Sequence, residues 1–207
     1  MLAFKYTIDD FKYYMRWAIG FVSTVCFMLV SVSLTHAQAV TLISDAVDGE
    51  LYTNTSHPEL YCLAKNIYFE AKSEPVAGQY AVADVVLNRV QDSRFPSTIC
   101  DVVYEGVMRE SWKTKQHKDL PDDKRIFHPV RHKCQFSWYC DGKSDKIKDS
   151  DAWRKCQEIA YRIARESRFR GITEKSTHYH ATYVSPKWAP QLDLVGRIGT
   201  HIFYRWR

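Results

Sequence analysis

Glu70 and Glu74 are two glutamates one helical turn apart, in a segment whose apolar residues recur at helical spacing. At about 100° per residue, Leu60, Leu63 and Ile67 fall on the same stripe as both glutamates. Such a stripe must face the core, where a carboxylate is costly to ionise unless it is paired or lines a cleft. Burial raises a carboxyl pKa toward the range that a general acid needs, so the pattern predicts Glu70 as a catalytic acid. The same pattern also fits a glutamate held in a structural hydrogen-bond network.

Two helices are predicted to position this acid. The first runs from about residue 58 to residue 72 and ends before Pro75, because a proline disfavours helical geometry in the preceding residue and lacks a backbone donor. Pro75 can then occupy the first turn of a second helix over residues 76–90. That second helix is apolar on more than one side, so we expect it to be central and to pack against the helix of Glu70.

The rest of the chain predicts one more long helix and several shorter segments. Residues 97–107 are predicted as a short capped helix and residues 151–169 as an amphipathic helix. The charged stretch 110–131, which contains two prolines, is expected to be a long surface loop. Aromatic and β-branched residues predict extended segments over 177–184 and 197–204. Together these elements predict a mainly α fold of the α+β type, with a helical core, short extended segments and a long surface loop.

The first 39 residues are expected to direct export and to lie outside the folded domain. Basic residues precede an uncharged run over 17–34, and small residues follow at 37–39, as in a signal peptide. Cleavage after this pattern is favoured, although the run is long enough for an uncleaved membrane anchor. We therefore expect residues 40–57 to be a linker or N-terminal extension and residues 58–207 to be one exported domain, in the periplasm or the extracellular space.

The net charge of the chain limits the kinds of partner that it is expected to bind. There are 29 Lys and Arg residues against 24 Asp and Glu residues, which is a formal charge of +5. This mild excess suits an anionic partner, but it falls short of the clustered basic surface that a nucleic-acid-binding protein shows. We therefore expect no nucleic-acid partner, and we expect the chain to act as a monomer.

Five cysteines lie outside the leader, and an exported chain is expected to pair them rather than keep free thiols. They are Cys62, Cys100, Cys134, Cys140 and Cys156. At least one disulfide is predicted, with Cys100, Cys134 or Cys140 as the favoured participants, and the spacing leaves the pairing open. Structural zinc sites use closely spaced pairs of ligands, and the chain has no two CxxC motifs. We predict no metal and no cofactor.

Several short segments, taken together, resemble a known family. In chain order they are NIYFEA at 66–71, EP at 74–75, GQ at 78–79, AVADVVLNRV at 81–90, FP at 95–96, CQFSW at 134–138, YHA at 179–181 and RIGTHIFY at 197–204. In this order and spacing, over about residues 60–205, they resemble the SleB/CwlJ family of cell wall hydrolases, of the spore cortex-lytic enzyme type. One departure is Ser73, where the family usually has glycine, and the change is expected to matter little if that position is helical.

The resemblance implies a lysozyme-like catalytic domain over residues 58–207, related to lytic transglycosylases and acting on the glycan strands of peptidoglycan. Glu70 matches the catalytic glutamate of the family. It would protonate the glycosidic oxygen between N-acetylmuramic acid and N-acetylglucosamine and then act as base on the muramic acid 6-hydroxyl, which gives a 1,6-anhydro product. Ordinary hydrolysis would use water in place of that hydroxyl.

The resemblance also suggests residues that bind the substrate. Gln135 and Ser137 match the Gln-Phe-Ser segment of the family and are expected to form hydrogen bonds to the sugar N-acetyl groups. Tyr179 and His180 match the Tyr-His-Ala segment and are expected to line the cleft. Tyr179 would orient Glu70 or steady the developing charge, and for His180 a purely structural role fits the sequence equally well.

Glu74 and two aromatic residues have both a functional and a structural interpretation. Two carboxylates one turn apart raise each other's pKa, so Glu74 would keep Glu70 protonated or bind the substrate. Alternatively, Glu74 is a helix-end acid paired to a basic neighbour such as Arg89. Phe136 and Trp138 offer faces on which sugar rings could stack, but a place in the core is favoured for both.

Two other classes of function remain open at the level of sequence. An N-acetylmuramoyl-L-alanine amidase would need about three zinc ligands and a general acid or base. His178, His180 and His201 could be assembled for that purpose, although the chain has no His-x3-His helix. A non-catalytic wall-binding module is the third class, favoured only if Glu70 is exposed and far from any cleft.

Overall fold

The computed structural model describes residues 52–207, so the predicted leader and most of the predicted linker lie outside the described residues. The described part contains five α-helices and two small antiparallel sheets. This composition confirms the predicted mainly α fold with short extended segments. No helix within residues 52–207 is long and apolar enough to cross a membrane.

The two helices predicted around Glu70 are both present. Helix α2 spans Pro58–Ala71, and its first turn tolerates Pro58 because the first backbone N–H groups of a helix have no intrahelical partner. Helix α3 spans Val76–Gln91 and begins directly after Pro75, which confirms the boundary expected from the proline. Glu70 therefore lies in the last turn of α2, close to the point where the chain turns into α3.

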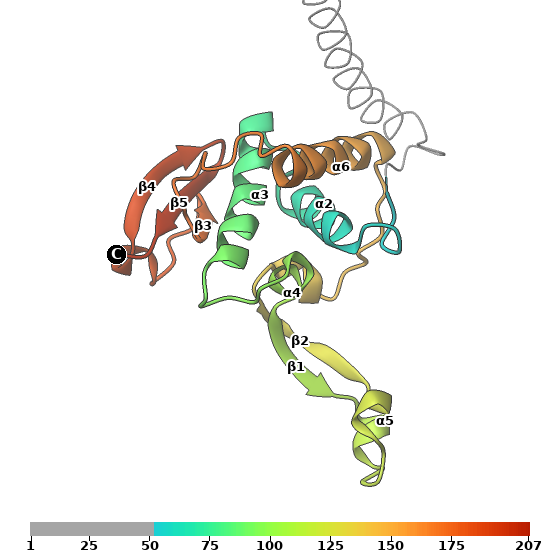
Figure 1. Ribbon diagram of the computed structural model, residues 1–207. Helices are drawn as coiled ribbons and strands as arrows, with labels where there is room; N and C mark the ends of the chain where they lie inside the picture. The colour runs from blue at the N-terminus through green and yellow to red at the C-terminus, as the bar shows by residue number, and fades with distance from the viewer. Residues whose placement is uncertain (1–51) are drawn as a thin grey trace, which may run out of the picture. The chain divides into compact units, whose positions relative to one another are not determined.

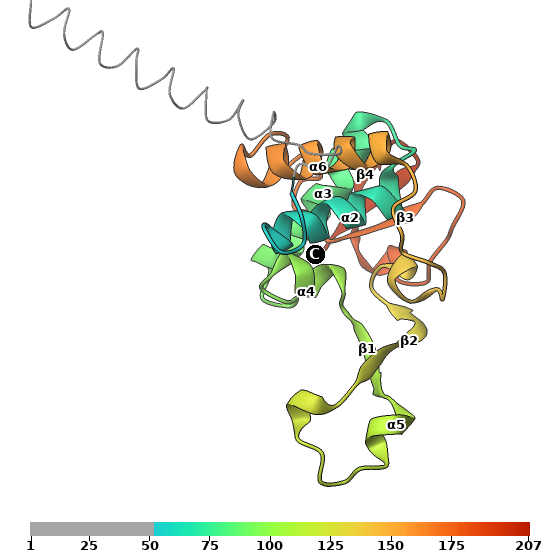
Figure 2. The same ribbon diagram turned by 90° about the vertical axis from the view of Figure 1, so that its right-hand side faces the viewer.

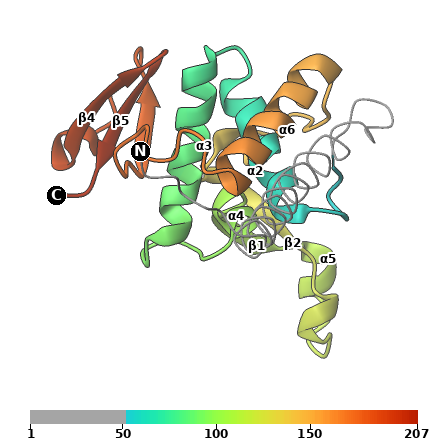
Figure 3. The ribbon, with the colours of Figure 1, turned by 45° about the horizontal axis from the view of Figure 1, so that its top comes forward.

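Helix α3 is buried on opposite sides, as its apolar composition predicted. On one side Ala83 and Val86 belong to the main core, which α2 and α6 also build. On the other side Ala81 and Val85 pack against Phe203 of the C-terminal sheet. Figures 1 and 3 show α3 lying between that sheet and the pair α2 and α6. The helix thus joins two layers that both contribute to the region around Glu70.

Helix α6 spans Ser150–Arg165, and the side chain of Asp149 caps it by accepting a hydrogen bond from the backbone N–H of Ala152 at 2.9 Å. Its buried side carries the predicted apolar stripe and packs on α2. The predicted end at residue 169 was wrong by four residues. Ser167 and Phe169 have φ angles of 55° and 59°, and a left-handed backbone cannot continue the helix.

The C-terminal part of the chain forms a three-stranded sheet in the order β3-β5-β4, of which β3 and most of β5 lie in the predicted extended segments and most of β4 was not predicted. Its strands are β3 (His178–Ala181), β4 (Asp193–Ile198) and β5 (His201–Arg205). Tyr179 lies opposite Phe203 in the β3–β5 register, and Ala181 lies opposite His201. Because cross-strand partners share a face, Tyr179 is placed over the apolar contact that α3 makes with Phe203.

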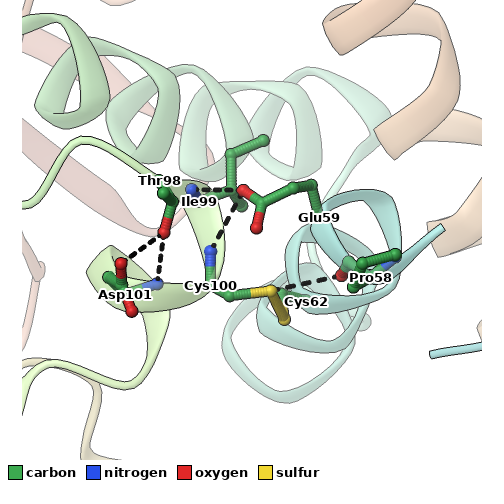
Figure 4. The surroundings of a disulfide bond; sticks show 7 residues. All are labelled: Pro58, Glu59, Cys62, Thr98, Ile99, Cys100 and Asp101. Atoms are coloured by element: carbon green, nitrogen blue, oxygen red, sulfur yellow. Dashed lines mark hydrogen bonds between the residues drawn. A yellow bond between two sulfur atoms is a disulfide. The ribbon is translucent and has the colours of Figure 1, made fainter. Parts of the chain in front are cut away.

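Helix α4 (Ile99–Val103) is connected to α2 by a disulfide and by hydrogen bonds to a carboxylate of α2, as Figure 4 shows. The disulfide joins Cys62 to Cys100. Beside it, Oε2 of Glu59 accepts hydrogen bonds from the backbone N–H groups of Ile99 and Cys100 at 2.6 and 3.4 Å. A second disulfide joins Cys134 to Cys140, and Cys156 is a buried free cysteine. The prediction of at least one disulfide is confirmed.

The segment between α4 and residue 134 differs from its prediction. Helix α4 ends at Val103, and the expected surface loop is a two-stranded antiparallel ribbon, β1 (Gly106–Glu110) and β2 (Phe127–Cys134), with helix α5 (Trp112–Lys115) between its strands. Figures 1 and 2 both show the ribbon extending from the helical body, with α5 far from that body. We refer to residues 106–134 as the ribbon. Its pairing is decided by contacts across the strands, which a local sequence pattern does not encode.

Candidate active site

A cleft of about 620 Å³ lies where α2, α3, the segment after β2 and the C-terminal sheet meet. Five of the six predicted site residues line it, namely Glu70, Gln135, Ser137, Tyr179 and His180. These five come from three separate parts of the chain, so the tertiary fold brings them together. Glu74 is not among the residues that line this cleft.

Glu70 is half-buried and faces Tyr179, whose hydroxyl donates a hydrogen bond to its Oε2 at 3.2 Å. Its other oxygen, Oε1, has no hydrogen-bond partner within residues 52–207. Burial raises the pKa of the Glu70 carboxyl above its ordinary value, against the hydrogen bond from Tyr179 and the charge of Arg89, which both lower it. The net effect favours the protonated acid more than in a free glutamate. Glu70 thus has one anchored oxygen and one oxygen available to a ligand.

Tyr179 stays protonated and donates its hydroxyl hydrogen to Glu70. Burial and the neighbouring charge of Glu70 raise the pKa of the Tyr179 hydroxyl well above its ordinary value, which keeps the phenol protonated. Its ring packs edge-on against His201, with 5.0 Å between the ring centroids, and also contacts Phe203. The two contacts on β5 therefore fix the tyrosine that orients the acid.

Arg89 is a residue of this cleft that the prediction of site residues missed. Only 2% of its surface is exposed, and its Nε donates to the backbone oxygen of Thr177 at 2.7 Å. An arginine stays charged even when burial lowers its pKa, so the cleft contains a fixed positive charge beside Glu70. The signal in the sequence was a basic residue inside helix α3, which is largely apolar.

Gln135 and Ser137 form the rim of the cleft on the side of the ribbon, and both are exposed. With the amide of Gln135 turned so that its oxygen faces Arg89, that oxygen accepts hydrogen bonds from both terminal guanidinium nitrogens at 3.0 and 2.9 Å. This orientation leaves the amide NH2 group free to donate elsewhere. Both rim residues lie between Cys134 and Cys140, so the second disulfide closes the segment that carries them.

His180 lines the cleft, but both of its ring nitrogens have partners. One nitrogen, Nδ1, lies 2.9 Å from the backbone oxygen of Ala181, and Nε2 lies 3.0 Å from the hydroxyl of Tyr204. The ring also stacks on Tyr204, with 5.3 Å between the centroids. These contacts support the structural interpretation of His180 that the sequence had left open.

The expected coupling of Glu74 to Glu70 was wrong. Partial burial raises the pKa of Glu74, but hydrogen bonds from Thr200 outweigh this effect and hold the pKa below its ordinary value. The backbone N–H of Thr200 donates to Oε2 at 2.9 Å, and the hydroxyl of Thr200 donates to Oε1. Glu74 therefore connects the β4–β5 turn to the end of α2. Its hydrogen-bond partner is Thr200 in this turn rather than Arg89.

Phe136 and Trp138 belong to the main core, as favoured from the sequence, with exposed fractions of 3% and 6%. The indole N–H of Trp138 donates to Oδ1 of Asn66 at 3.0 Å, which satisfies its one polar group inside the core. Both side chains nevertheless form part of the wall of the cleft. They support the rim residues from below and leave little ring surface for a sugar.

Two further side chains of the cleft were not predicted as site residues. Asp145 lies in the segment after the second disulfide, and burial raises the pKa of its carboxyl, against the charge of Lys65, which lowers it. His201 is 7% exposed, and its Nδ1 has no hydrogen-bond partner within residues 52–207. Across the same residues, no group of three or more His, Cys, Asp or Glu side chains is arranged to hold a metal ion.

Comparison with known proteins identifies the family. Residues 73–204 match the family model described as Cell Wall Hydrolase, which covers more than half of the chain and begins three residues after Glu70. The spore cortex-lytic enzyme of Bacillus subtilis (strain 168) is 38% identical over 61 residues, which are 30% of this chain and 20% of that protein. The spore cortex-lytic enzyme of Bacillus cereus is 42% identical over 50 residues, or 24% of this chain and 19% of that protein. The chain thus spans about a fifth of the length of these curated relatives.

Two solved structures were also matched. The catalytic domain of the Bacillus cereus SleB protein is 23% identical with a TM-score of 0.47, and the match covers 72% of this chain and 91% of that one. The catalytic domain of the germination-specific lytic transglycosylase SleB from Bacillus anthracis has the same identity and TM-score, with 72% and 96% of the two chains covered. The family match over residues 73–204 is what assigns the chain. By that match, the chain belongs to the cell wall hydrolase family.

Proposed function

We propose that this chain cleaves the glycan strand of peptidoglycan between N-acetylmuramic acid and N-acetylglucosamine, as a lytic transglycosylase with Glu70 as general acid and base. The observation that carries the proposal is the state of Glu70. It lines a cleft, its pKa is raised by burial, and only one of its oxygens is engaged, by Tyr179. A carboxyl group that is protonated near neutral pH and accessible to a ligand is what glycosidic bond cleavage requires.

The reaction would proceed in two proton transfers at one carboxyl group. Glu70 first gives its proton to the glycosidic oxygen, so the bond between that oxygen and C1 of the muramic acid residue breaks and the leaving sugar departs as an alcohol. The carboxylate then accepts the proton of the 6-hydroxyl as the hydroxyl oxygen bonds to C1. Tyr179 holds one carboxyl oxygen, and this leaves the other for both transfers.

Substrate binding would involve Gln135, which Arg89 orients. Because the Gln135 oxygen faces Arg89, its amide N–H groups are free to donate to the carbonyl of a sugar N-acetyl group. Ser137 lies on the same rim and offers a hydroxyl that can donate or accept. A cleft of this size, with polar groups along one edge, suits a carbohydrate chain. The substrate lies outside the cytoplasmic membrane, so the proposal also requires export.

The test is the substitution Glu70→Gln, which keeps the shape of the side chain and removes the proton. We expect the rate of cleavage of soluble glycan strands to fall by about 100-fold or more, since general acid catalysis contributes on that order. Glu166→Gln is the matched control, because Glu166 is exposed and does not line the cleft. A folded Glu70→Gln protein that retains more than about a tenth of the activity would rule out the assignment.

Mass spectrometry of the products identifies the bond and the nucleophile. A 1,6-anhydro muramic acid end is lighter by one water than the reducing end that hydrolysis leaves, so the expected product is distinguished directly. Prolonged EDTA treatment should leave the activity on soluble strands intact. Loss of activity that zinc alone restores, together with release of intact stem peptides, would instead identify an amidase.

A further inference from the structure

The ribbon is an unusual surface that the proposed function leaves unexplained. It contributes five of the eleven large hydrophobic side chains that are exposed in residues 52–207. These five are Val107, Met108, Trp112, Ile126 and Phe127. Trp112 is the most exposed of them, at 67%, and it lies in α5, away from the helical body in Figures 1 and 2. Exposed apolar side chains that gather on one segment mark an interaction surface.

The same segment has a net positive charge of +4, close to that of the whole chain. Residues 106–134 contain eight Lys and Arg residues against four Asp and Glu residues, whereas the formal charge of the whole chain is +5. Arg125 is the one basic residue of the ribbon that forms an ion pair with a described residue, to Glu110 and Asp122. The other seven basic side chains of the ribbon are exposed, and none of them forms an ion pair within residues 52–207.

Of the five exposed apolar side chains, Trp112 and Ile126 line a shallow groove of about 900 Å³ on the ribbon, where they meet basic side chains. Trp112, Ile126 and Val130 supply its apolar part, and Lys113 and Arg131 are among the cations beside it. This groove lies outside the catalytic cleft and shares no lining residue with it. A ligand that fits this groove must therefore carry both apolar groups and negative charge.

We propose that the ribbon docks on an anionic phospholipid surface. Lipid phosphates would neutralise the exposed cations, and the aromatic and aliphatic side chains would enter the boundary between headgroups and acyl chains, where Trp and Phe are favoured. A second copy of the chain fits less well, because two ribbons of the same positive charge repel each other. An anionic wall polymer could stack on Trp112 and Phe127, but it offers nothing to Val107, Met108 and Ile126.

The test is hydrogen–deuterium exchange of the full chain with phosphatidylglycerol-containing vesicles and with pure phosphatidylcholine vesicles. Because exchange is read peptide by peptide, binding through the apolar run 17–34 does not hide the result. We expect slower exchange in residues 106–134 on the anionic vesicles only, and the protection should weaken as salt rises. Lys113→Glu combined with Lys115→Glu should weaken the protection of the ribbon from exchange by at least about tenfold. Trp112→Ser combined with Phe127→Ser should also weaken this protection.

Lys175→Glu and Leu194→Ser are the matched controls, because both residues are exposed and lie outside the ribbon. Cleavage of soluble glycan strands should be unchanged in the ribbon variants, so failure here is distinguishable from failure of the proposed function. The proposal is overturned by any of three results: no ribbon protection on anionic vesicles, equal protection on phosphatidylcholine, or protection by a soluble anionic wall polymer in place of vesicles. Ribbon protection that grows with protein concentration without lipid would identify a second copy as the occupant.

Discussion

At the scale of single residues, the state of Glu70 is set by opposing effects. Burial disfavours its ionised form and raises its pKa, whereas the hydrogen bond from Tyr179 and the buried charge of Arg89 favour that form and lower it. Burial prevails, so the acid is more protonated than a free glutamate. The two opposing groups also stabilise the carboxylate that remains after the proton has left, as the proposed role of acid and then base requires.

Replacing Tyr179 by phenylalanine tests this balance. The Tyr179 hydroxyl stabilises the ionised form of Glu70, so Tyr179→Phe should raise the pKa of Glu70 further. In the proposed mechanism the protonated acid is the active form, so activity should be lost as pH rises through its pKa. The alkaline limb of kcat/KM against pH should therefore move to higher pH, and the plateau should fall far less than in Glu70→Gln. Tyr161→Phe is the control, and a limb that stays in place or moves to lower pH contradicts the assignment.

At the scale of elements, Glu70 is positioned by hydrogen bonds that connect the C-terminal sheet to the end of α2. Glu74 makes this connection through Thr200, next to Gly199, whose φ angle is +60°. A Cβ atom at Gly199 would lie 2.1 Å from Oε2 of Glu74, so the turn approaches the carboxylate more closely than any other residue type allows. The strand that carries Tyr179 pairs with β5, which begins directly after this turn.

Glu74→Ala should therefore lower the free energy of unfolding by about 1 to 2 kcal/mol at neutral pH, the scale of hydrogen bonds to a partly exposed charged group. Because the pKa of Glu74 is lower in the folded chain, its contribution is present above the unfolded pKa and is lost as pH falls through the folded value. Denaturant unfolding at several pH values measures this. In a cycle with Thr200→Ala, which removes the hydroxyl but keeps the backbone donor, the two effects should not add, and additive effects would mean that the hydroxyl bond contributes nothing.

The two disulfides also act on different elements, and their removal should have different consequences. Cys62 and Cys100 are 38 residues apart and join α2 to α4, so Ser replacements at both should cost about 4 kcal/mol of stability. Cys134 and Cys140 are only six residues apart, so their replacement should cost about 2 kcal/mol.

The second pair encloses Gln135 and Ser137 on the rim of the cleft, so its loss should reduce kcat/KM beyond the effect of lower stability. Assays well below the unfolding temperature, with both variants fully folded, separate the two effects. Equal activity in the two double variants would show that the rim is positioned without its disulfide.

At the scale of the described chain, the structure has a well-packed body and a ribbon with almost no core of its own. Thr114 is the one buried residue in 106–134, whereas α2, α3 and α6 each bury a large part of their surface. The free energy of local opening follows the apolar area that a segment buries, so the ribbon should open far more readily than the body.

Trypsin should therefore cut the native chain first within the ribbon, at its exposed lysines and arginines. The two pieces should stay together under native conditions, because α2 and α3 pack against α6, which lies after the cut. No disulfide crosses the cut, since the two pairs are Cys62–Cys100 and Cys134–Cys140, so the pieces should separate on a denaturing gel without reductant. First cleavage in the body, at a site such as Arg162 in α6, would contradict this view.

The sequence by itself determined the elements that depend on local pattern. The two helices around Pro75 and the stripe that carries Glu70 were visible in it, because helical periodicity and proline geometry act over a few residues. The presence of a disulfide and the family resemblance were also visible, whereas the connectivity of the cysteines was not. The state of Glu74 was not visible. Its partner, Thr200, is 126 residues away, and no helical spacing reports such a contact.

Only the tertiary structure decided what surrounds the acid and what the charged stretch becomes. Arg89 and Asp145 enter the cleft because distant elements pack together there, and each charge changes the electrostatics of the site in a way that depends on burial. The ribbon forms because strands that lie far apart in the chain pair with each other, whereas its sequence indicates only a polar excursion. Long-range pairing and burial are properties of the packed chain, and they set both the chemistry of the cleft and the surface that the ribbon exposes.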